Sequence, residues 1–266
     1  MHRRVLAGVV AIAAFALAPA GASAWAPAAT APVHPGVQTV TSGAQCTANF
    51  IFTSGGNTYV GQAAHCSGTG AATSTNGCTS DSLPLGTPVT IGGASKPGTL
   101  AYNSWLAMHS AGEKDAETCD YNDLALVKVD PADVGKVNPS IPKWGGPTGI
   151  GTAAALDDVY SYGNSSLRGG VTQLSPKRGK VVEVSPGGWS YTLYTLTPGI
   201  PGDSGSAFLN ADGAALGILS TVAIAPLAAS NGVGDIGKEI AYARAHGFAD
   251  LTLVNGTVPF TGGLPI

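Results

Sequence analysis

Ser204 lies in the stretch GIPGDSGSAF, directly after an aspartate, and its hydroxyl is a candidate nucleophile. A serine hydroxyl reacts poorly near neutral pH, so it needs an adjacent base, and that base needs an acceptor that orients it. Glycine, serine and aspartate also favour tight turns, so this stretch alone equally fits a polar surface loop. The evidence for chemistry must therefore come from partners elsewhere in the chain.

His65 is the histidine best placed to act as the base. An unperturbed pKa of about 6.5 suits histidine to that role. His65 ends the apolar stretch YVGQAAH and precedes Cys66. The other histidines beyond residue 24 lie in a Pro-rich stretch, in a polar stretch and at the end of an expected helix: His34, His109 and His246. A structural histidine at the end of a strand is the alternative interpretation.

Asp123 is the candidate for orienting the histidine. It opens the apolar run LALVKV, where a strand would enter the core. A partly buried carboxylate must find donors, and an imidazole N–H is one. An isolated turn residue is the alternative, whereas Asp120 and Asp130 look like solvated loop acids.

Two glycines, Gly202 and Gly205, flank the pair Asp203-Ser204. Glycine permits positive φ angles, so successive backbone N–H groups can point at one spot. The amides of Gly202 and Ser204 would then form an oxyanion hole, which stabilises the negative charge of a tetrahedral intermediate. The following SAFLN run predicts a strand that would hold this turn rigid.

The elements that must position these residues are mostly short strands. Apolar runs alternate with Gly, Asn and Pro clusters along the chain, which indicates an all-β sandwich or barrel. One helix is expected in DIGKEIAYARAHG, with Asp235 as its N-cap and Gly247 as its stop. A Pro- and Gly-rich stretch at 138–151 divides the β-rich part into two comparable halves.

Residues 1–24 are typical of an export signal. Arg3 and Arg4 precede an apolar run from Val5 to Leu17, and the segment ends in Ala-Ser-Ala. A membrane anchor is the alternative, but it needs about 20 apolar residues. We therefore expect a secreted, extracellular product without a membrane partner. Residues 25–42 are rich in Ala, Pro and Thr, which predicts a flexible leader or a short pro-segment.

The charge balance argues against a nucleic-acid partner. Loss of the two arginines of the signal, with no acid in that segment, takes the formal net charge from −3 to −5. Nucleic-acid binding relies on clustered Lys and Arg, which this composition lacks. Only 11% of the residues are charged.

Four cysteines in an exported chain predict two disulfides. Three connectivities are possible, of which we favour sequential pairing. A zinc site is disfavoured because the sequence has no Cys-x-x-Cys pair. We expect no metal and no other cofactor. The favoured pairs are Cys46 with Cys66 and Cys78 with Cys119.

Three stretches together resemble the chymotrypsin-fold, or trypsin-like, serine peptidases, and among them the small secreted actinobacterial type. The stretches are AAHC at 63–66, NDLALVKV at 122–129 and PGDSGS at 201–206. They follow that family's order of His, Asp and Ser, which differs from the order in α/β-hydrolases and subtilisins. The resemblance spans roughly residues 41–247.

The resemblance implies two antiparallel six-stranded β-barrels, with the active site in the cleft between them, plus a C-terminal helix. Residues 43–140 would form the N-terminal barrel with the His and Asp of the triad. Residues 141–266 would form the C-terminal barrel with the Ser, followed by the helix and a tail. The implied activity is that of a serine endopeptidase working through an acyl-enzyme on polypeptide substrates, and we expect a monomer.

The resemblance also assigns roles around the triad. It implies that Ser220 supports Asp123 and that Asp203 is buried against a cation. In animal members that cation is a new N-terminus freed by cleavage after a basic residue, but this chain has no Lys or Arg between Arg4 and Lys96. We therefore predict an internal cation, Arg168. Two positions of the usual GDSGGP motif differ, since this chain has GDSGSA.

The resemblance places the floor of the substrate pocket in the stretch YTLYTLTPGIP, at 191–201, which contains no acid. Its walls would be STVAIA and SNGVG, which are small or apolar, so we expect an apolar residue before the scissile bond. A catalytically silent, protease-like binding protein is one alternative. An esterase using the same triad is another, although Ser206 breaks the G-x-S-x-G motif of α/β-hydrolases.

Overall fold

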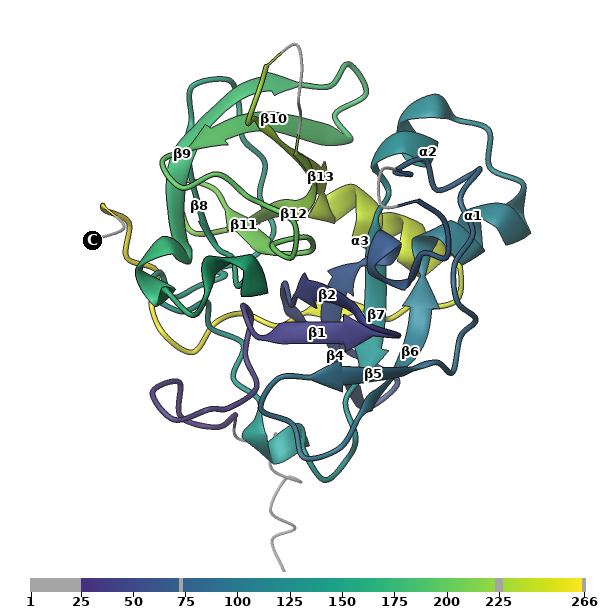
Figure 1. The fold of residues 1–266 in the computed structure, drawn as a ribbon, viewed down its shortest axis with the longest axis horizontal. Helices are drawn as coiled ribbons and strands as arrows, with labels where there is room; N and C mark the ends of the chain where they lie inside the picture. The colour runs from purple at the N-terminus through teal and green to yellow at the C-terminus, as the bar shows by residue number, and fades with distance from the viewer. Residues whose placement is uncertain (1–24, 72–73, 223–226, 265–266) are drawn as a thin grey trace, which may run out of the picture.

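The computed structural model describes residues 25–71, 74–222 and 227–264, which form two β-rich lobes (Figure 1). The expected export signal at residues 1–24 lies outside the described residues. Within the described ranges, no helix is long and apolar enough to cross a membrane.

The N-terminal lobe is an antiparallel sheet of eight strands in the order β14-β3-β4-β7-β6-β5-β1-β2. Its central strand β7 is the run LALVK, in which the first four residues are all buried. The bounds are β1 Gln38–Thr41, β2 Ala44–Thr47, β3 Ile51–Ser54, β4 Asn57–Ala63, β5 Pro88–Ile91, β6 Gly98–Asn103, β7 Leu124–Lys128 and β14 Thr252–Leu253.

The C-terminal lobe is a closed antiparallel barrel of six strands in the order β10-β13-β12-β11-β8-β9. The bounds are β8 Asp158–Tyr162, β9 Pro176–Val184, β10 Ser190–Thr195, β11 Ala207–Leu209, β12 Ala215–Val222 and β13 Asn231–Asp235. Its interior is filled by buried apolar side chains, among them Val159, Val181, Leu193, Phe208, Leu216 and Val233. The expected β-rich fold is therefore confirmed. The N-terminal sheet has eight strands and not the six we expected, because β1, before residue 43, and β14, from the tail, join the six strands that lie within residues 43–140.

The expected C-terminal helix is confirmed as α3, Ile236–Ala245. The Asp235 side chain accepts a hydrogen bond from the Lys238 amide and so caps the helix, as the sequence predicts. Two further helices, α1 (Ser104–Ala111) and α2 (Ala116–Tyr121), were not expected. They are short and are capped by Asn103 and Asp115. Four 3-10 turns complete the description: η1 Ala64–Ser67, η2 Val134–Lys136, η3 Ser166–Arg168 and η4 Thr172–Leu174.

The segment 25–42 is not the flexible leader that its composition indicates. Val33 and Val37 are buried in the core of the N-terminal lobe, and the Ala26 amide donates to the Val137 carbonyl at 2.9 Å. The end of this segment is β1, which pairs with β2 and β5. Burial of the two valines and strand pairing therefore outweigh the Pro-rich composition.

The tail beyond α3 contacts both lobes. Its strand β14 pairs with β3 of the N-terminal sheet, and further on Phe260 packs edge-on against Tyr160 of the barrel, with ring centroids 5.2 Å apart. The yellow end of the chain in Figure 1 follows this path from one lobe to the other. The tail therefore joins the two lobes.

Candidate active site

His65 and Asp123 meet as the sequence predicts. His65 lies in η1, immediately after β4, and Asp123 immediately precedes β7, the neighbouring strand. His65 Nδ1 and Asp123 Oδ2 are 2.7 Å apart, and the His65 amide donates to Asp123 Oδ1 at 2.9 Å. The carboxylate is buried, whereas the imidazole is 19% exposed. Because Nδ1 faces the carboxylate, Nε2 is the ring nitrogen left for chemistry.

Ser220 contributes a third donor to the carboxylate. Its hydroxyl donates to Asp123 Oδ2 at 2.6 Å from β12 of the barrel, so this contact joins the two lobes. The family resemblance assigns Ser220 the role of supporting Asp123, and the two side chains are in direct contact here. Both oxygens of the Asp123 carboxylate accept hydrogen bonds, which suits a charged group inside a protein.

The surroundings of His65 act on its pKa in opposite directions. Burial lowers the pKa of His65, while the charge of Asp123 and its hydrogen bond raise it. The net result is a pKa above the ordinary value of 6.5. The carboxylate therefore stabilises the imidazolium form, which a general base must adopt after taking a proton.

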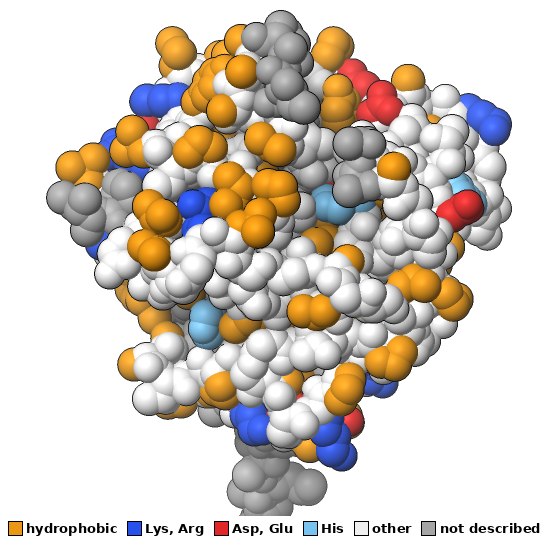
Figure 2. All heavy atoms as spheres, in the orientation of Figure 1, with side chains coloured by type: hydrophobic (Ala, Val, Ile, Leu, Met, Phe, Trp, Pro, Cys, Tyr) orange, Lys and Arg blue, Asp and Glu red, His pale blue; other side chains and the backbone are white. Residues whose placement is uncertain are grey.

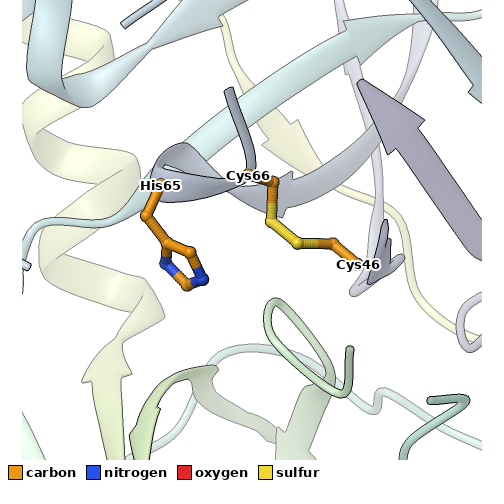
Figure 3. Close-up of side chains that lie close together, drawn as sticks. All are labelled: Cys46, His65 and Cys66. Atoms are coloured by element: carbon orange, nitrogen blue, oxygen red, sulfur yellow. A yellow bond between two sulfur atoms is a disulfide. The ribbon is translucent and has the colours of Figure 1, made fainter. Parts of the chain in front are cut away.

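Both predicted disulfides are present and pair sequentially. Cys46 is bonded to Cys66, and Cys78 to Cys119. Figure 3 shows the first bridge next to the imidazole of His65. The ligand atoms of His65 and the two cysteines lie within 4.8 Å of one another, but both sulfurs are committed to the disulfide and so cannot act as thiolate ligands. The bridge instead joins β2 to the turn that carries His65.

The loop that carries Ser204 has the expected backbone shape. Gly202 and Gly205 adopt φ angles of +93° and +85°. A Cβ on Gly205 would lie 2.8 Å from the Ala63 amide nitrogen, so the loop packs directly against the end of β4, two residues before His65. The Ser204 carbonyl accepts a hydrogen bond from the Thr47 amide at 2.8 Å.

The reactive groups of this loop are free of internal hydrogen bonds. Within the described part of the chain, the amides of Gly202 and Ser204 have no acceptor, and no hydrogen bond joins the Ser204 hydroxyl to His65. The structure thus brings His65, Asp123 and Ser220 into contact and places Ser204 on a loop beside them. The two amides remain available to an incoming oxygen atom.

Asp203 is held by two buried cations. Arg168 Nη2 lies 2.6 Å and Lys177 Nζ 3.0 Å from Asp203 Oδ2. Arg168 is the internal cation that we predicted for Asp203, and the two side chains are in contact. Lys177 was missed, because its context SPKRGK is rich in charge and is typical of a solvated surface. In the structure the Lys177 side chain has no exposed area.

The environment of Lys177 makes it an unusual lysine. Burial lowers its pKa to about 8, and the neighbouring Arg168 charge acts in the same direction, while Asp203 opposes both. Lys177 also donates to the carbonyls of Thr197 and Pro198, and Arg168 donates to the same Pro198 carbonyl at 2.9 Å. Both cations therefore anchor the loop that leads to Ser204.

Two polar side chains of β2 clamp the same loop from the other lobe. Gln45 Nε2 and Thr47 Oγ1 donate to the Gly202 carbonyl at 2.9 and 2.8 Å. The Asp203 amide of the same peptide unit donates to the Ile200 carbonyl at 2.8 Å, so both polar groups of this unit are held. The sequence carried no signal for the contacts of Gln45 and Thr47, since each residue acts across 155 or more positions.

A polar groove adjoins Ser220. It lies between α2 of the N-terminal lobe and strands β10, β12 and β13 of the barrel. Its lining is small and rich in hydroxyls: Thr75, Asp120, Tyr121, Ser190, Thr192, Ser220, Thr221, Ser230, Gly232 and Gly234. Parts of the expected pocket walls, STVAIA and SNGVG, thus line this groove, while residues 223–226 lie outside the described residues. The described lining is polar, which differs from the small or apolar walls that we expected, because Ser220, Thr221 and Ser230 present their hydroxyls here.

A β-rich two-lobed fold with a histidine-aspartate pair beside a glycine-flanked serine loop defines the serine proteases of trypsin-like fold. The chain belongs to the family of the trypsin-like peptidase domain, whose family model matches residues 46–218. This confirms the resemblance seen in the three sequence stretches.

Solved structures show the same fold at low sequence identity. Thermobifida fusca protease A is 18% identical with a TM-score of 0.54, over 84% of this chain and 99% of that one. A glutamic acid-specific serine protease, described as using a histidine triad in substrate binding, is 20% identical with a TM-score of 0.51, over 84% and 100%. Rv3671c of Mycobacterium tuberculosis, in an inactive form, is 18% identical with a TM-score of 0.50, over 84% and 90%. Among curated proteins, none matches this chain.

Proposed function

We propose that this chain is a secreted serine endopeptidase in which Ser204 is the nucleophile, His65 the general base and acid, and Asp123 the group that orients His65. The observation that carries the proposal is the 2.7 Å contact between His65 Nδ1 and the buried Asp123 carboxylate. That contact leaves Nε2 as the proton acceptor, beside the loop of Ser204.

The proposed reaction proceeds in two halves. His65 Nε2 takes the proton of the Ser204 hydroxyl while Oγ attacks the substrate carbonyl carbon, and the carbonyl oxygen becomes an oxyanion bound by the amides of Gly202 and Ser204. The C–N bond then breaks as the imidazolium gives its proton to the leaving amine, which leaves an acyl-enzyme. Water, activated by His65, repeats the sequence and releases the acid. Catalytic hydrogen bonds of this kind often tighten only when substrate binds.

Secretion is supported by the two disulfides and by the expected export signal. Disulfides persist in oxidising compartments outside the cytoplasm. Cys46–Cys66 closes a separation of 20 residues and Cys78–Cys119 one of 41. Removal of either native bridge from a secreted domain typically destabilises it by about 2–5 kcal/mol.

Covalent labelling tests the proposed nucleophile. A fluorophosphonate probe should form one adduct on Ser204, because only a serine activated by a base reacts with it at neutral pH. Mass spectrometry of the labelled peptide is the measurement. Ser204→Ala should abolish the adduct, and Ser166→Ala, at an exposed serine of η3, should retain it. An unlabelled wild-type protein would favour a catalytically silent binding protein.

The residue before the scissile bond is expected to be apolar. The stretch 191–201 contains no acid, and two strongly exposed leucines, Leu167 and Leu196, flank the loop that leads to Ser204. Arg168 ties these two segments together through the Pro198 carbonyl. Apolar side chains also gather on the barrel side of the face in Figure 2.

Peptide p-nitroanilides that differ only in their last residue measure this preference. Leu or Phe at that position should give kcat/KM at least about tenfold above Arg, since burial of an apolar side chain contributes about 1.5–3 kcal/mol. A faster cleavage after Arg would contradict the proposal. Hydrolysis of simple esters without cleavage of any peptide would instead favour an esterase.

A further inference from the structure

A buried acid on α3 contacts the backbone of Asp123. Glu239 Oε1 accepts a hydrogen bond from the Asp123 amide at 2.9 Å, across 116 positions of sequence. Glu239 lies on α3, and its side chain is fully buried. Figure 1 shows α3 running from the barrel end of β13 toward α1 of the other lobe. Glu239 therefore reaches the active site from behind.

We propose that Glu239 is a positioning residue, which holds the backbone of Asp123 so that its carboxylate stays aligned with His65. This inference rests on the proposed function. It assigns no chemistry to Glu239 itself, which acts only through Asp123.

Asp123 is anchored by its side chain and by both polar groups of its backbone. Its side chain is held by His65 and Ser220, and its carbonyl accepts a hydrogen bond from the Ala64 amide at 2.5 Å. Its amide is held by Glu239 alone. Three separate elements thus fix one residue, and the contact from α3 restrains the point at which the chain enters β7. Without it, a buried N–H group would lose its only acceptor.

The protonation state of Glu239 suits this role. Burial raises its pKa well above 4.5, the hydrogen bond from the Asp123 amide opposes that rise, and the negative charges of Asp123 and Asp235 add to it. Burial raises the pKa of the nearby Tyr102 hydroxyl, and the charge of a deprotonated Glu239 would add to that rise. A neutral carboxyl group can accept the Asp123 amide without placing a second negative charge beside the His65–Asp123 pair.

The space for the carboxyl group depends on a glycine of β13. A Cβ on Gly234 would lie 2.7 Å from Glu239 Oε1 and 2.8 Å from the Tyr121 carbonyl oxygen. Any larger residue would therefore push the carboxyl group away from the Asp123 amide. Gly234→Ala thus offers a second way to break the contact, without changing Glu239.

The test compares Glu239→Leu with Glu239→Gln. Leucine removes the acceptor, so kcat should fall by about 10- to 100-fold, since a misplacement of about 1 Å can reduce rates by that much. KM should change by less than about threefold, because no residue of α3 lines the groove beside Ser220. Glutamine keeps a carbonyl oxygen in place of the neutral acid and should restore kcat to within about threefold. Gly234→Ala should resemble the leucine variant.

Ile240→Ala is the matched control. Ile240 is a buried apolar neighbour on the same helix, so its truncation should lower the thermal midpoint without lowering kcat per titrated active site. Rates are measured on a p-nitroanilide and divided by the fraction of sites that a fluorophosphonate labels. In the leucine variant the acidic limb of the pH–rate profile should also move to lower pH, because a displaced Asp123 stabilises the His65 imidazolium less well.

Several outcomes would overturn the inference. The first is a leucine variant with the wild-type kcat, and the second is a glutamine variant as slow as the leucine variant. If the leucine variant does not fold, a Gly234→Ala variant with unchanged kcat would overturn the inference instead. None of these touches the proposed function, which fails if the wild-type protein is not labelled on Ser204 or does not cleave peptides.

Discussion

Replacing Asp123 by Asn is expected to lower kcat by about 10⁴-fold, the loss that the same change causes in another serine protease. The carboxylate accepts three hydrogen bonds, from the His65 amide, from His65 Nδ1 and from the Ser220 hydroxyl. An asparagine offers one oxygen and one NH₂ group, so it can satisfy only some of these donors and favours the wrong imidazole tautomer. Steady-state kinetics on a p-nitroanilide measure the loss.

The same comparison predicts a shift in pH dependence. His65 acts as a base only when neutral, and its pKa lies above 6.5, so the acidic limb of wild-type kcat/KM should have its midpoint above pH 6.5. Loss of the Asp123 charge should move that midpoint downward. The raised pKa also means that the His65–Asp123 pair stabilises the fold fully below about pH 6.5, and that this stabilisation is lost as the pH rises through the folded pKa.

Asp130→Asn is the control for both measurements. Asp130 lies at the far end of β7, where its side chain accepts a hydrogen bond from the Ala132 amide in a loop. Its replacement should leave the rate and the acidic midpoint unchanged. If Asp123→Asn retained more than about a tenth of the activity, the role assigned to Asp123 would be wrong.

Replacing Asp203 by Asn is expected to lower the free energy of unfolding by about 3–5 kcal/mol, because it leaves two buried cations without a counter-charge. The side chains of Arg168 and Lys177 are 8% and 0% exposed, and both lie within 3.0 Å of Asp203 Oδ2. Oδ1 of the same carboxylate accepts the Ser165 amide at 2.9 Å. Urea denaturation monitored by tryptophan fluorescence measures the change.

Asp158→Asn provides the comparison for this second prediction. Asp158 also pairs with two cations, Arg178 at 3.2 Å and Lys180 at 3.0 Å, but those side chains are 29% and 56% exposed. Ion pairs in contact with solvent contribute about 0–1 kcal/mol, so its loss should be small. Equal effects of the two variants would show that burial of the Asp203 cluster has no energetic consequence.

Local patterns were sufficient for several features of this protein. The N-cap Asp235 and the apolar spacing that follows it predicted α3, because helix capping involves only neighbouring residues. The glycines around Ser204 predicted positive φ angles for the same reason. The stretches AAHC and NDLALVKV pointed to His65 and Asp123, because each of these residues lies at the end of an apolar strand. The two strands are neighbours in the sheet, so the side chains meet.

Composition misled where packing decides. The Pro-rich segment 25–42 resembles a leader, but Val33 and Val37 find a place in the N-terminal core. The expected N-terminal six-stranded barrel is an eight-stranded sheet, because β1 joins it from the segment before residue 43 and β14 returns from the far end of the chain. Both results depend on contacts between segments far apart in the chain, which no local sequence pattern predicts.

By itself, the sequence determined the family and the three stretches that could carry catalysis, and it predicted Arg168 as an internal cation. Only the tertiary structure decided which other polar groups support them: Lys177 on Asp203, Gln45 and Thr47 on Gly202, and Glu239 on Asp123. Each of these contacts joins segments distant in sequence through one side chain. Such a contact leaves no periodicity or spacing along the chain, and its strength depends on burial, which only the packing of the two lobes creates.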